Sequence, residues 1–215
     1  MANASGAFGL RPIAKMGSGS NSTGSSGYTK YEIANGNTNV IYQGSPVIPL
    51  STGFIDIVGA AAGGTVGLVG VFYGCEFVSS VTGELTFSNY WPGSGADSNH
   101  DVIAHVYDNP MQTFVITTDG TITSRATALG HTFANANFAA GQSGSTTTGI
   151  SSAKLAVGTI NDTAALHLRI IGVEDDPSSS DFTAAGIGMI VRLNNSYNSP
   201  NGAKVAGTPS TTGLN

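Results

Sequence analysis

The run Asp101-Val-Ile-Ala-His-Val-Tyr107, then Asp108-Asn-Pro110, then Gln112-Thr-Phe-Val-Ile-Thr117, decides the fold class of this chain. Both apolar runs are short and rich in β-branched and aromatic residues, and turn-forming residues separate them. Similar runs recur elsewhere, at 28–33, 40–42, 47–50, 54–58, 65–73, 166–173 and 187–193. No helical pattern of about 10–15 residues lies between them, which disfavours a parallel α/β sheet. The pattern predicts an all-β fold of antiparallel β-sandwich or β-barrel units with little helix.

The composition agrees with this fold class and excludes one class of partner. Hydrophobic residues make up 40% of the 215 positions, which is enough for a core, but only 10% are charged. An ordinary globular protein has about 25% charged residues, and long surface helices usually carry many Glu and Lys. The chain has eight Lys and Arg residues against thirteen Asp and Glu residues, which gives a net charge of −5. These few basic residues form no basic stripe, so we expect no nucleic-acid binding.

Neither a disulfide nor a membrane segment is expected. Cys75 is the only cysteine, so an intrachain disulfide or a Cys-based zinc site is excluded. The first residues have no basic region followed by an apolar one, as a signal peptide would. The apolar stretch 54–73 contains Asp56 and several glycines, so it is better explained as two strands joined by a turn at 59–64 than as a membrane helix.

We expect four segments along the chain. They are an extended N-terminal arm with a Gly/Ser linker at 1–27, a first β unit at 28–95, a second β unit at 96–198, and a polar C-terminal tail at 199–215. The linker composition at 17–27 is typical of a flexible tether. The tail is nearly free of core-forming residues.

The apolar part of the arm is the candidate partner-binding site. An apolar segment beyond a flexible tether lowers solubility unless something buries it, and a neighbouring subunit is the nearest candidate. A frayed terminus is the alternative. The residues that we expect to bind a partner are Phe8, Leu10, Arg11, Pro12 and Ile13.

Candidate catalytic and metal-binding patterns are weak. Oxygen ligands alternate at Asp97, Asn99 and Asp101, as a hard cation requires, but Val102 and Asp108 stand where an EF-hand has Gly and Glu. A solvated polar turn is the alternative, and the sequence leaves cation binding open. The four histidines form no H-x-x-x-H pair.

Nucleophile and paired-carboxylate patterns are no stronger. The run 141–145 misses a Gly-x-Ser-x-Gly elbow by one residue. Carboxylates at 174–176 precede Pro177 as in a turn, although paired carboxylates can hydrolyse glycosides. We expect no enzymatic activity, no cofactor and no metal.

Several segments resemble a family of tailed-bacteriophage virion structural proteins. These are 2–13, Tyr31-Glu-Ile-Ala34, 41–48, Leu155-Ala-Val157, 166–177 and Val191-Arg-Leu-Asn194. The resemblance implies a capsid decoration (cement) protein on the outer capsid surface of the virion, which stabilises the shell by bridging neighbouring capsid subunits. It implies the major capsid protein as a partner and a homo-oligomer, trimer or dimer.

Two other roles compete with decoration. One is a tail, neck or fibre component, because Gly- and Thr-rich β proteins occur there as well. The other is a carbohydrate-binding adhesive β module, in which Tyr90, Trp91 and Tyr107 would be exposed stacking platforms.

Overall fold

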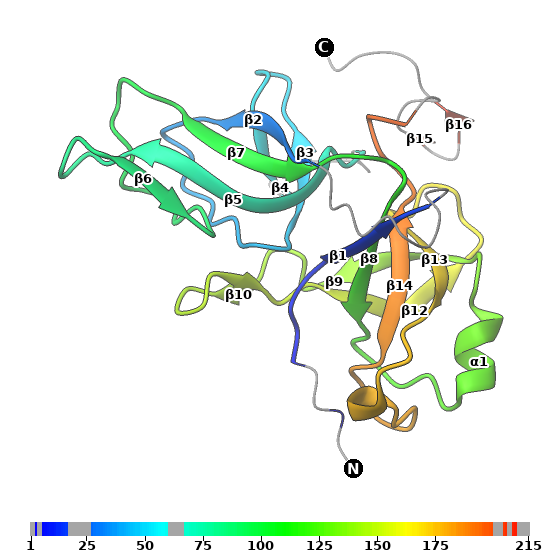
Figure 1. Ribbon diagram of the computed structural model, residues 1–215. Helices are drawn as coiled ribbons and strands as arrows, with labels where there is room; N and C mark the ends of the chain where they lie inside the picture. The colour runs from blue at the N-terminus through cyan, green and yellow to red at the C-terminus, as the bar shows by residue number, and fades with distance from the viewer. Residues whose placement is uncertain are drawn as a thin grey trace.

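The computed structural model describes residues 3, 6–16, 27–59 and 67–199, and the backbone of 204–205 and 208–209. Strands form 44% of the chain and the sheets are antiparallel, which confirms the predicted all-β class. Two six-stranded sheets form most of the part of the molecule that the structure describes (Figure 1). Among the described residues, no helix has the length and apolar character to cross a membrane.

The first sheet has the strand order β2-β7-β5-β3-β4, with β6 added to β5. Its strands are β2 (Thr29–Ile33), β3 (Pro46–Pro49), β4 (Ile55–Ile57), β5 (Gly70–Val78), β6 (Leu85–Ser88) and β7 (Val102–Tyr107). Alternate residues of β7, namely Val102, Ala104 and Val106, face a core that also contains Phe72 and Trp91. The edge strands β2 and β4 contact each other, so the sheet curls around this core.

The second sheet has the order β1-β8-β14-β13-β9-β12. Its strands are β1 (Arg11–Lys15), β8 (Gln112–Thr117), β9 (Asn135–Ala139), β12 (Lys154–Asn161), β13 (Leu168–Val173) and β14 (Gly188–Leu193). A bridge between Thr118 and Leu155 brings β12 back to the end of β8. The strands from β8 to β12 therefore curl into a barrel, and β1 lies on the remaining free edge of β8.

Short elements connect the strands of the second sheet. They are α1 (Arg125–Gly130), β10 (Gly144–Ser145), β11 (Ile150–Ser151) and the 3-10 helix η1 (Pro177–Ser179). The Ser124 hydroxyl accepts a hydrogen bond from the Thr127 N–H and so caps α1. In the expected polar tail, the backbone forms β15 (Lys204–Val205) and β16 (Thr208–Pro209), which pair with each other. Most of the tail and the linker at 17–26 lie outside the described residues.

The division of the chain differs from the predicted boundary at 95/96. The predicted boundary places β7 in the second unit, but β7 pairs with β2 and β5 in the first sheet. The chain passes to the second sheet only at 108–111, between β7 and β8. The prediction of this boundary was wrong because the inward residues of β7 belong to the first core.

The two sheets are packed together rather than merely linked. Ile48, Leu68 and Val71 come from the first part of the chain but are buried in the core of the second sheet. The Leu68 N–H donates to the Asn195 carbonyl at 2.7 Å, and the Leu10 N–H donates to the Gly44 carbonyl at 2.9 Å. A Cβ on Gly9, where φ is +68°, would lie 2.6 Å from the Gly44 carbonyl oxygen, so only glycine fits this contact.

Candidate interaction surfaces

The N-terminal arm is a strand of its own chain. Arg11 pairs with Val115 and Lys15 with Gln112 in the antiparallel ladder between β1 and β8, which is interrupted by a bulge at Ile13. The Leu10 side chain is 1% exposed and lies in the core of the second sheet. The expectation that Leu10 binds a partner is therefore wrong, because its own chain already buries it.

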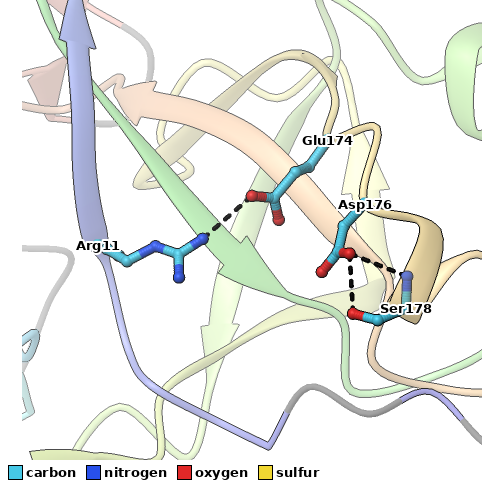
Figure 2. Close-up of polar contacts among 4 residues, drawn as sticks. All are labelled: Arg11, Glu174, Asp176 and Ser178. Atoms are coloured by element: carbon cyan, nitrogen blue, oxygen red, sulfur yellow. Dashed lines mark hydrogen bonds and ion pairs between the residues drawn. The ribbon is translucent and has the colours of Figure 1, made fainter. Parts of the chain in front are cut away.

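An ion pair also links the same segment to the residue that directly follows β13. The Arg11 guanidinium donates to the Glu174 carboxylate at 3.0 Å (Figure 2). Both side chains keep some exposure to solvent, so the pair contributes little to stability by itself. It nevertheless holds the arm against the turn that follows β13.

The other predicted arm residues remain accessible in part. The Arg11 guanidinium lies 4.7 Å from the centre of the Phe8 ring. Phe8, Arg11 and Pro12 line an apolar cavity of about 340 Å³ between the two sheets, together with Tyr73, Tyr107 and Ile150. Ile13 is 41% exposed and is not among the residues that line this cavity. These four residues stay candidates for contact with a partner.

The acidic run at 174–176 has structural roles. Glu174 binds Arg11, and Asp175 binds Arg125. Asp176 accepts hydrogen bonds from the N–H and the hydroxyl of Ser178 and so caps η1 (Figure 2). These bonds lower the pKa of the Asp176 carboxyl. Each carboxylate is engaged in holding a turn, and the geometry favours the turn interpretation over glycosidase chemistry.

Carboxylate oxygens of the stretch 97–101 also accept hydrogen bonds from the chain's own backbone. Asp97 Oδ1 accepts from the Asn99 N–H at 2.6 Å, which lowers the pKa of the Asp97 carboxyl. Asp101 Oδ1 accepts from the Asn35 N–H at 3.0 Å. Within 3, 6–16, 27–59 and 67–199, no group of three or more His, Cys, Asp or Glu side chains is arranged to hold a metal ion. This geometry is that of a hydrogen-bonded polar turn.

Trp91 is not a surface platform. It is fully buried in the first core, where its ring lies edge-to-face with Phe77 at 5.4 Å. Its Nε1–H donates to the Asn37 carbonyl at 3.1 Å. Tyr90 stacks on Tyr42, and Tyr107 packs edge-on against Tyr73. The carbohydrate-binding alternative therefore lacks the largest of the three aromatic rings that it requires at the surface.

An aromatic surface of different composition lies on the outer face of the first sheet. Tyr28 and Tyr73 are both exposed, with nearly parallel rings 6.3 Å apart. His105 packs edge-on against Tyr28 at 4.4 Å. Lys30 and Glu76 form an ion pair on the same face at 2.6 Å. The alternation along β7 predicts this face from the sequence, because the outward-facing residues of the strand alternate with its buried residues.

Two clusters of exposed apolar side chains occupy opposite ends of the molecule. In the hairpin of β5 and β6, Val81 is 89%, Leu85 57% and Phe87 69% exposed. After α1, Phe133 is 75% exposed, and Leu129 within α1 is also exposed. Figure 1 shows β6 at one end of the molecule and α1 at the other. We call these the β6 end and the α1 end.

His105 should make stability depend on pH. Burial lowers its pKa, while Glu76 acts to raise it and Lys30 to lower it. Since the folded state disfavours the proton, stability is full above the ordinary His pKa of about 6.5 and is lost as pH falls below it. We expect the melting temperature to fall between about pH 7.5 and about pH 5, and His105→Gln to show a shallower fall. An unchanged slope in the variant would assign the effect to other groups.

Comparison with known protein families, curated proteins and solved structures found no match to this chain.

Proposed function

We propose that this chain is a non-enzymatic virion structural protein that decorates the outer surface of a phage capsid. In this role it stabilises the shell by bridging neighbouring subunits of the major capsid protein, and it acts as a homo-oligomer. Two lines of support are independent of each other. One is the resemblance of segments such as 2–13 and 166–177 to virion proteins, and the other is the distribution of exposed apolar side chains.

The observation that carries the proposal is the separation of the β6 end from the α1 end (Figure 1). A bridging protein needs two contact surfaces that are far apart on a well-packed body. The sheets share core residues, and the arm crosses between them through Leu10 and Gly44. The five large apolar side chains exposed at these two ends favour contacts with other proteins.

Backbone strain at Phe133 is a second feature that distinguishes the α1 end. Phe133 has φ of +73°, a left-handed conformation that a bulky residue rarely adopts. Such strain costs about 1–3 kcal/mol and tends to be kept where the side chain has a role. Here an exposed phenyl ring is held out at the surface while its N–H donates to the Ile170 carbonyl at 2.9 Å.

Phe133→Gly should therefore change stability and binding in opposite directions. Glycine adopts positive φ freely, so we expect the free energy of unfolding to rise by about 1 kcal/mol. Loss of the ring should sharply lower the occupancy of the protein on purified shells that lack their native copy. Chemical denaturation and a shell pull-down measure the two effects.

Thr123→Gly is the matched control, because Thr123 is exposed, has φ of +72° and precedes the same helix. It should relieve similar strain and leave shell binding unchanged. Equal shell binding by wild type and Phe133→Gly would remove the α1 end from the proposal. Binding to purified tails in place of shells would favour the tail, neck or fibre alternative.

A further inference from the structure

Within the part of the chain that the structure describes, the edge strand β6 has no charge, proline or bulge to keep another chain from pairing with it. Natural edge strands are usually protected by charge, proline, a bulge or closure of the sheet. The edge strand β1 has Arg11, Pro12, Lys15 and a bulge. The edge strand β2 has Lys30 and Glu32 and contacts the opposite edge strand β4, and β12 returns to β8. The strand β6, Leu85-Thr-Phe-Ser88, has none of these features, and among the strands that the structure describes its one partner is β5.

The hydrogen-bonding pattern shows which backbone groups face its free edge. The Ser79 N–H donates to the Glu84 carbonyl at 2.9 Å, so residues 79 and 84 stand at a hydrogen-bonded position of the ladder, with one of its two bonds formed. Hydrogen-bonded and non-hydrogen-bonded pairs alternate along an antiparallel ladder. Phe77 with Thr86 is then the next hydrogen-bonded pair, while Leu85 and Phe87 stand in non-hydrogen-bonded pairs with β5. Their N–H and C=O groups therefore point away from β5.

We propose that β6 pairs with β6 of a second copy, antiparallel about a two-fold axis at Thr86. This register sets Leu85 of one copy opposite Phe87 of the other, twice. The backbone groups of Leu85 and Phe87 are those that face the free edge, so the two pairs form four hydrogen bonds between the copies.

The side chains fit the same register. Leu85 and Phe87 lie on one face of β6, opposite Val78 and Glu76 of β5. Both are more than half exposed in the single chain, so pairing would cover a leucine with a phenylalanine on each side of the axis. Glu84 of each copy comes opposite Ser88 of the other, so no like charges face each other directly.

The interface joins the first sheet of one copy to the first sheet of the other and leaves both α1 ends outermost. It rests on β6 alone and does not depend on capsid binding. If the proposed function also holds, the bridging unit is a dimer with one α1 end for each of two capsid subunits.

Sedimentation of the full chain tests the interface. We expect wild type to sediment as a dimer of the 21.7 kDa chain. Phe87→Lys places an ammonium group opposite Leu85 and should raise the dissociation constant by about tenfold or more. Val81→Lys is the matched control on the same hairpin, since Val81 is exposed but lies beyond the proposed pairing, and it should remain dimeric. A monomeric wild type, or equal effects of the two variants, would overturn the proposal.

Cysteine cross-linking tests the register. Thr86→Cys places two thiols opposite each other at the axis, within reach of a disulfide. It should cross-link with itself, whereas Leu85→Cys and Phe87→Cys should cross-link only when mixed. Cys75 should not interfere, because it is buried and burial raises the pKa of its thiol to about 12. A dimer in which Thr86→Cys stays reduced while Leu85→Cys links to itself would contradict the register.

Discussion

Replacing Leu10 with alanine is expected to lower the free energy of unfolding by about 2–5 kcal/mol. The side chain is 1% exposed and fills the core of the second sheet beside residues of β8 and β14. Its removal leaves a cavity between the arm and the barrel that the surrounding strands cannot fill. Equilibrium denaturation followed by far-UV circular dichroism measures the change.

Ile13→Ala is the matched control for this variant. Ile13 lies in the same arm but is 41% exposed, so its loss should change the free energy of unfolding by about 0.5 kcal/mol or less. If both variants unfold like wild type, the arm does not contribute to the core. The original expectation of an arm that binds a neighbouring subunit through Leu10 would then be restored.

Replacing Trp91 with alanine is expected to cost about 3–5 kcal/mol. The ring is fully buried against Phe77, and its loss would also leave the Asn37 carbonyl without its donor. Trp91→Phe keeps most of the packing and loses only the hydrogen bond, so about 1–2 kcal/mol is expected. We expect the melting temperature to decrease in the order wild type, Trp91→Phe, Trp91→Ala.

Fluorescence provides a second test of Trp91 in the unmodified protein. It is the only tryptophan, so its emission reports this site alone. We expect a blue-shifted maximum and weak quenching by acrylamide. Strong quenching, together with an unchanged melting temperature in Trp91→Ala, would show that Trp91 lies at the surface and would support the carbohydrate-binding alternative.

The fold class was predictable because strand periodicity is a local property. The alternation in β7 gives both its buried residues and its outward ones directly from the sequence. The sheet that a strand joins is a non-local property, and nothing within 101–117 shows that β7 and β8 belong to different sheets. The predicted unit boundary failed for this reason.

The candidate site was predictable only in part. A Gly/Ser segment after Ile13 favours a free arm, but the open edge of β8 and the space for Leu10 exist only in the folded sheet. Trp91 lies before a Pro-Gly turn, yet its bridge to Ile41 brings the ring inside. The positive φ of Phe133 leaves no trace in the sequence, since that conformation is imposed by the turn between α1 and β9.

A cryo-EM map of the native particle tests the bridging role most directly. We expect density for this chain on the outer capsid surface, with the α1 end of each copy against a different capsid subunit. Phe133 should lie within the contact, and Leu10 should be buried in its own chain. A map that places the chain in the tail, or on the shell with Phe133 in solvent and Leu10 inserted in a neighbour, would contradict this role.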